Sequence, residues 1–443
     1  MPRRDPRPLL VFLLALAPAA SAGGAPAGEQ APASLDLGRM PDDRTLAQLL
    51  WARSPDLVTA RSKLASARSE VVRADVLPNP SLDASWNTIP VGRTNPPDLS
   101  DPLEQVPNYA VSLSMLVEIA KRGPRQRAAR SGFEAAALDT YELLRQRYYD
   151  TLERIAEVAA AQVRVAALGD LVGDAHRLTE LQQERTRRGD APGVDADRAA
   201  LEEDKYAGTL RDERQKLAEG LVACGHTAGV PCRPFADAKD ASAYLSRGIR
   251  AAPGDLDTRP DIRSLAAQQA SATASLELAH NKRIPDPTFR IGYVYDQFVV
   301  AGNQRNSLMA GVSVPLPVFD RGQADALAAA ASADAAGRAQ ALLVTQAERD
   351  AAALATQAED VAARRRALTE TSLPLARRLV DTLERAVRQG GTSLSELLLA
   401  RRSLGELVLD DADVELLAFR VDAALARNGA AGPPAPPDLA PVP

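Results

Sequence analysis

The chain has few of the residues on which catalysis and metal binding usually depend. Its 443 residues include three histidines, two cysteines and only 4% aromatic residues. The histidines, His176, His226 and His280, lie far apart, and no Cys-x-x-Cys or His-x-x-x-His motif occurs. We therefore expect no enzymatic activity, no cofactor and no metal site. So few aromatic residues do not suit an ordinary globular core of this size and favour long packed helices rich in Ala and Leu.

An excess of positive charge is also lacking. The 53 Lys and Arg residues are outnumbered by 58 Asp and Glu residues, which gives a formal charge of −5. This balance argues against a partner such as nucleic acid. After the N-terminal segment no run of 18 or more apolar residues occurs, so the sequence predicts no transmembrane helix in the mature chain.

Residues 1–22 have the organisation of a secretory signal peptide. A basic start precedes a short apolar run over residues 9–17 and a small-x-small sequence at residues 20–22. Cleavage there would remove three Arg and one Asp, and the formal charge would change from −5 to −7. Residues 23–41, rich in Ala, Gly and Pro, are predicted to form a flexible linker.

The two cysteines, Cys224 and Cys232, lie close together in the sequence. In an oxidising compartment this spacing allows a small disulfide loop. Two unpaired thiols are the alternative.

The second half of the chain repeats the organisation of the first. In each half a helical run ends at a Pro-x-Pro sequence, at residues 78–80 and 285–287, because proline disfavours helix at and before its own position. Alternating apolar residues follow, which indicates strands with one apolar face. The predicted strands cover about residues 81–89 and 109–119 in the first half, and 288–298 and 307–319 in the second.

A very long helix follows the second strand of each half. These helices are predicted over about residues 124–188 and 323–389, each about 100 Å long at 1.5 Å per residue. Apolar residues at every seventh position in the second helix predict a left-handed supercoil, with a kink or break at Pro374. Both long helices end at glycines, and a returning helix follows each, over about residues 195–223 and 394–427.

The sequence thus predicts a mostly α fold with a small β part, duplicated in the order helix, strand, strand, long helix, helix. The predicted segments are a signal peptide (1–22), a linker (23–41), a first repeat (42–225), a connector (226–254), a second repeat (255–428) and a Pro-rich disordered tail (429–443).

Strands of about ten residues are long enough to cross a bilayer. Four strands cannot close on themselves, and lipid does not tolerate an open sheet edge. Three copies would supply twelve strands for a closed barrel and would gather the long helices into a tube. The alternative is a soluble four-stranded sheet beside a coiled-coil stalk.

This duplicated order resembles the TolC family of outer-membrane efflux proteins over about residues 46–427. Residues 259–293 and 311–322 are similar to the heavy-metal (CzcC/CusC-like) branch. The resemblance implies a homotrimer in the outer membrane of a Gram-negative bacterium, with a twelve-stranded β-barrel in the lipid and a coiled-coil tunnel in the periplasm. Its implied partners are a periplasmic adaptor (membrane fusion) protein and an inner-membrane pump of the resistance-nodulation-division (RND) class.

The function implied is a passive exit duct of a tripartite efflux system for heavy-metal cations. A duct for drugs or other organic solutes has the same fold and is the first alternative. A periplasmic coiled-coil adaptor or scaffold is the second, although the duplicated order argues against it.

The resemblance also implies acidic side chains around the periplasmic aperture, at the turns after the long helices. Glu396 matches this position in the second half, and Asp195 and Asp197 lie at the turn of the first. One helical turn after Glu396, where a second acidic residue is expected, the chain has Leu399. Acidic residues also favour helix N-termini for capping alone, which is the alternative interpretation. Arg401 and Arg402 either pair with these acids or belong to a solvated face.

Overall fold

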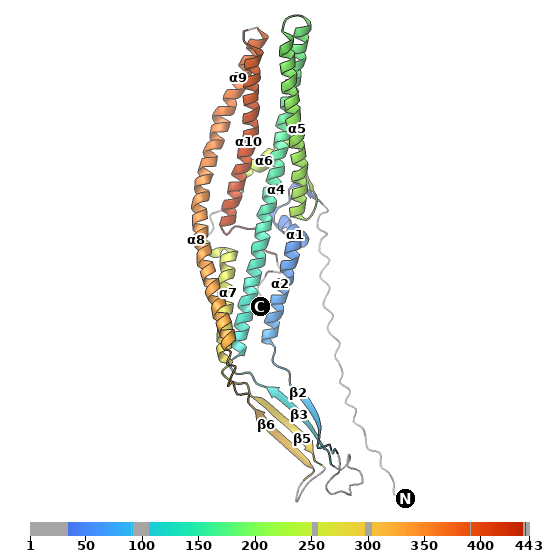
Figure 1. Ribbon diagram of the computed structural model, residues 1–443, viewed down its shortest axis with the longest axis vertical. Coiled ribbons are helices and arrows are strands. Elements are labelled where there is room, and N and C mark those ends of the chain that lie inside the picture. Colours follow the sequence, from blue (N-terminus) through green and yellow to red (C-terminus); the bar gives the residue numbers. More distant parts are fainter. Residues whose placement is uncertain are drawn as a thin grey trace, which may run out of the picture. The chain divides into compact units, whose positions relative to one another are not determined.

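The computed structural model describes residues 34–89, 91, 106–249, 256–296, 304–389, 391–436 and 439, so the predicted signal peptide lies outside the described residues. Two helical hairpins and a four-stranded sheet form most of this part (Figure 1). Its helices are α1 (Asp43–Arg53), α2 (Pro55–Asp75), α4 (Arg122–Arg187), α5 (Gly193–Ala228), α6 (Ala238–Arg247), α7 (Pro260–Asn281), α8 (Gln323–Ala367), α9 (Leu373–Arg388) and α10 (Leu394–Asn428). Its strands are β1 (Leu35–Asp36), β2 (Ser81–Asn87), β3 (Asn108–Leu116), β4 (Cys232–Arg233), β5 (Thr288–Tyr295) and β6 (Asn306–Ser313).

The larger sheet is antiparallel throughout, with the strand order β2-β3-β5-β6. The register places most of the apolar residues of all four strands on one face, as in the row Leu82, Leu113, Ile291, Ala310. This face is open: Leu82 is 70% exposed and Leu308 is 84% exposed. The opposite face is largely polar, and there the Ser114 hydroxyl donates to Asp83 over 3.2 Å.

The long helices begin and end close to the predicted residues, but the second is interrupted. A π-helical turn, Leu368–Ser372, separates α8 from α9 just before Pro374, where the sequence predicts a kink or break. Proline has no N–H to donate to the carbonyl four residues earlier, and the wider turn accommodates this loss. The Leu373 N–H accordingly donates to the carbonyl of Leu368, five residues back.

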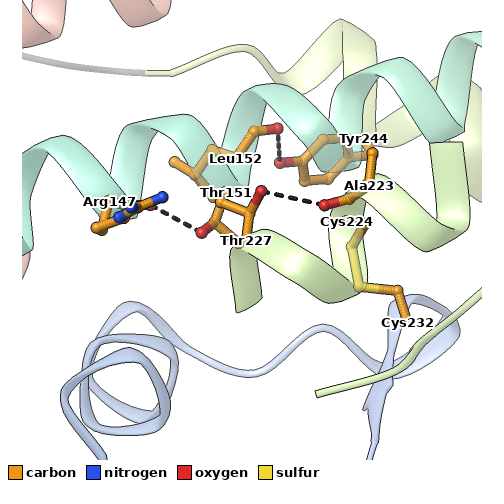
Figure 2. The surroundings of a disulfide bond; sticks show 8 residues. All are labelled: Arg147, Thr151, Leu152, Ala223, Cys224, Thr227, Cys232 and Tyr244. Carbon is orange, nitrogen blue, oxygen red and sulfur yellow. Dashed lines mark hydrogen bonds between the residues drawn. A yellow bond between two sulfur atoms is a disulfide. The ribbon is translucent and has the colours of Figure 1, made fainter. Parts of the chain in front are cut away.

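The segment predicted as a connector, residues 226–254, has more structure than expected. It includes the end of α5, strand β4 and helix α6, and β4 pairs in parallel with β1. The ring of Tyr244 on α6 stacks against Phe419 of α10, with 5.2 Å between the centroids. The Tyr244 hydroxyl donates to the carbonyl of Leu152 on α4 (Figure 2). Helix α6 therefore belongs to the core between α4 and α10.

Cys224 and Cys232 form a disulfide in the structure, with 6.0 Å between their Cα atoms. Figure 2 shows that it joins the last turns of α5 to β4. Cys224 is fully buried. The bond thus fastens the β1–β4 pair to the end of a long helix.

The Pro-rich tail also differs from expectation over residues 429–436. Instead of being disordered, this segment is hydrogen-bonded to α4 through its carbonyl groups. Tyr and Arg side chains satisfy these carbonyls, a long-range interaction that composition alone does not reveal. Of the remainder, only residue 439 is among the described residues.

Within the described part, no helix combines the length and the apolarity needed to cross a membrane.

Candidate functional site at the hairpin turns

The first turn joins α4 to α5 through Gly189, which has a left-handed backbone (φ 81°). The Gly189 N–H donates to the carbonyl of Thr186, and the Asp190 N–H donates to that of Arg185. This pair of bonds is the Schellman ending of a helix, which strongly favours glycine. Local sequence thus fixes where α4 stops and where the acidic residues of α5 begin.

The second turn joins α9 to α10, and it lies beside the first. Arg198 of α5 donates to the Ser395 hydroxyl of α10 over 3.1 Å. Below this contact, apolar side chains of α4, α9 and α10 form one buried cluster: Leu178, Val380, Val387, Leu394, Leu397 and Ala400. The two hairpins therefore meet near their ends, as Figure 1 shows.

Glu396 is exposed on the first turn of α10. Its N–H donates to the Ser393 hydroxyl over 3.4 Å, and its carboxylate accepts from the Thr392 hydroxyl. These contacts form a local cap of the helix. In one chain, Glu396 therefore stabilises the start of α10 while its carboxylate stays at the surface.

The acids of the first turn are arranged differently. The carboxylate of Asp195 is 3.8 Å from the guanidinium of Arg198, three residues later. Asp197, two residues further along α5, is exposed. Because Arg198 also donates to Ser395, it connects Asp195 to the start of α10, a role that no signal in the sequence indicated.

The chain has a relative and several solved neighbours of known identity. No family model matches it. It is 24% identical over 286 residues, 63% of this chain, to the cobalt-zinc-cadmium resistance protein CzcC of Cupriavidus metallidurans, and the match spans 64% of that protein's length. Structures of the channel CusC (TM-score 0.71, 15% identity, 87% and 92% of the two chains) and of the Vibrio cholerae outer membrane protein VceC (0.70, 17%, 88% and 96%) have the same fold. This chain has the TolC-family channel fold.

This fold confirms the predicted mostly α fold with a small β part, and it is the fold that the family resemblance implies. The structurally similar proteins include the outer-membrane channel OprN and the outer membrane protein VceC, in agreement with the location predicted for this chain. In this fold the acids of the two turns lie at the ends of the helical hairpins. Leu399, one turn after Glu396, is 67% exposed.

The two arginines that follow do not contact the acids of the turns. Arg401 pairs with Glu384 of α9 and donates to the Asp174 carbonyl of α4 over 3.1 Å. Arg402 pairs with Glu406 along α10. Arg401 thus connects the two hairpins instead of neutralising their ends.

A His–Glu contact joins α4 to α5 further from the turns. The Nδ1 atom of His176 is 2.8 Å from the Glu203 carboxylate. This hydrogen bond raises the pKa of His176 and lowers the pKa of Glu203. Among the described residues, no cluster of three or more His, Cys, Asp or Glu side chains could hold a metal ion.

Proposed function

We propose that this chain is the outer-membrane component of a tripartite efflux system, a passive exit duct for heavy-metal cations. The observation that carries the proposal is the sheet β2-β3-β5-β6, which has one apolar, exposed face and two edge strands. An exposed apolar face of this size marks a surface that is covered in the working protein. The long hairpins continue from the same sheet and provide the second half of a duct.

Lipid is the proposed cover for the apolar face. Backbone groups at the outer edges of β2 and β6 need partners in lipid, since an unsatisfied group there costs several kcal/mol. A second and a third copy of the chain supply these partners when β6 of one copy pairs with β2 of the next. Three copies place twelve strands in one closed barrel.

The proposed partners of the duct are a pump and an adaptor protein. A passive duct without chemistry of its own depends on a pump, proposed here to be of the RND class in the inner membrane. A periplasmic adaptor protein would connect this pump to the duct. The CzcC relative supports heavy-metal cations as cargo.

Glu396, Asp195 and Asp197 are the proposed acidic residues of the periplasmic aperture. Three copies around an axis would place these acids close together, and their negative potential would concentrate cations at the entrance. The capping contacts of Glu396 are compatible with this role, because they leave its carboxylate exposed.

Growth of a deletion strain tests the cargo. We expect the strain to become sensitive to divalent metal cations and to regain resistance when the full-length gene is restored. Sensitivity confined to organic compounds would assign the chain to the alternative duct for organic solutes. Unchanged growth against the whole metal and drug panel would contradict an efflux role.

Conductance in a planar bilayer tests the aperture. In the wild-type channel, divalent cations added on the periplasmic side should lower the conductance by binding at the acids. In Glu396→Gln this block should weaken several-fold, because three negative charges leave the entrance. Glu406→Gln, which removes an exposed charge from the same helix, is the matched control and should be blocked like the wild type. Equal block in all three proteins would remove Glu396 from the site.

A further inference from the structure

The C-terminal segment follows a continuous stripe of side chains on α4. Phe133, Ala137, Tyr141, Arg145 and Tyr149 are each four residues apart, so they lie along one face of the helix. The stripe has two halves of different chemistry. Its Tyr141–Tyr149 half presents hydrogen-bond donors, and its Phe133–Ala137 half is apolar.

The donor half of the stripe binds carbonyl groups of the tail and of the last turn of α10. Arg145 Nη1 donates to the carbonyls of Arg427 (2.7 Å), Gly429 (2.9 Å) and Ala431 (3.3 Å). The Tyr149 hydroxyl donates to Ala431 over 3.1 Å, and the Tyr141 hydroxyl donates to Pro433 over 2.8 Å. The tail therefore runs antiparallel to α4, from Tyr149 toward Phe133.

Arg145 is a buried residue of this contact and not a surface charge. Its side chain is 1% exposed, and its other nitrogen atoms donate to both oxygens of Glu142, over 2.7 and 3.0 Å. A buried guanidinium is tolerated only when its donors are satisfied. The carbonyl groups of the tail accept hydrogen bonds from Arg145 Nη1, which Glu142 does not contact.

The sequence of the tail suits binding along this stripe of α4. Pro433 and Pro436 are buried, while Pro434 and Ala435 between them are exposed. This spacing of three residues is the period of the polyproline helix, which places every third residue on one side. Prolines also restrict the unbound chain, so ordering this segment costs less conformational entropy than ordering an average one.

The apolar half of the stripe receives the end of the described tail. Leu439 packs against the buried cluster of Leu64, Val71 and Phe133, which joins α2 to α4. Ala435 and Leu439 also line a cavity of about 500 Å³ together with Val71, Phe133 and Tyr141. The segment thus spans from the end of α10, along α4, to α2.

We propose that residues 429–436, together with Leu439, are a strap: the chain's own C-terminal segment is the occupant of the groove on α4, and its docking holds α2 and α10 against α4. The strap also lines one side of the cavity between α2 and α4. It depends on neither the cargo nor the partners of the duct.

Hydrogen exchange of the detergent-purified protein tests the strap. Three chains are compared: the full chain, a chain that ends at Leu439 and a chain that ends at Gly429. The first two should exchange alike. The chain that ends at Gly429 should exchange about tenfold faster in residues 57–71 and 133–149. A synthetic peptide of residues 430–443 should restore the protection of these residues. Equal exchange in all three chains would overturn the proposal, as would exchange restored by a scrambled peptide.

A point variant covers the case in which the shortened chain does not fold. A Cβ atom at Gly432 would lie 2.8 Å from the Tyr141 hydroxyl and 3.1 Å from Arg145 side-chain carbons. Gly432→Ala should therefore displace the strap and raise exchange over residues 133–149. Gly169→Ala is the matched control on α4, because no neighbouring atom lies within 4 Å of the added carbon. Its exchange over residues 133–149 should equal that of the unchanged protein. Unchanged exchange in Gly432→Ala would contradict the strap.

Discussion

At the scale of single residues, a few buried charges connect helices that are distant in the sequence. Glu213 on α5 accepts hydrogen bonds from Arg164 of α4 over 2.9 Å and from Lys216 over 2.7 Å. Arg164 also donates to Asp413 of α10 over 2.6 Å. One arginine thus joins three helices, and its partners satisfy a carboxylate that is largely removed from water.

The pKa of Glu213 leads to a prediction about pH. Burial raises this pKa, but the hydrogen bonds from Lys216 and Arg164 outweigh burial and bring it below the ordinary 4.5. A lowered carboxyl pKa stabilises the fold above the unfolded value and loses this effect as the pH falls through the folded one. Glu213→Gln should lower the thermal midpoint at pH 7, by the equivalent of about 1–3 kcal/mol, and should flatten its decline below pH 4.5.

Asp212→Asn is the control for this prediction, because Asp212 is the exposed neighbour of Glu213. Melting curves recorded between pH 3 and pH 7 decide the matter. If Glu213→Gln melts like the wild type at every pH, the contacts of Glu213 with Arg164 and Lys216 contribute nothing to stability.

At the scale of helices and strands, the sequence predicts well those elements that have a local pattern of residues. The alternation of Val111, Leu113 and Met115 predicted β3, and the glycines predicted the ends of the hairpins. Helix α6, the β1–β4 pair and the docked tail were not foreseen. These elements depend on contacts between residues far apart in the chain, such as Tyr141 with Pro433, and no local pattern encodes such contacts.

The same limit applies to the candidate site. The acids at the hairpin turns could be found from the sequence, because they follow glycine turns. The contact of Arg198 with Ser395 and that of Arg401 with Asp174 could not, since each joins the two repeats. Which helices lie side by side is a property of the packed chain.

The disulfide gives a prediction at the scale of elements. It closes a short loop between α5 and β4, which by loop length contributes about 2–3 kcal/mol. The double variant Cys224→Ala and Cys232→Ala should therefore melt at a lower temperature and expose the β1–β4 pair to exchange. The unreduced wild-type protein, once unfolded, should take up no thiol reagent. Uptake of two equivalents would contradict the bond.

At the scale of the whole molecule, the proposed channel contains more than one polypeptide. Its sheet has an open apolar face and two edges that lack further strands within the described residues, while its helices are already packed against one another. Duplication explains the even number of strands, because each repeat contributes one hairpin. A closed barrel then requires several copies of the chain.

The mass of the detergent-solubilised protein, measured by light scattering with the detergent contribution subtracted, tests this requirement most directly. Copies that complete one another's sheets should form a stable complex of three chains, with no smaller species on dilution. A solubilised protein with the mass of a single chain would contradict the account.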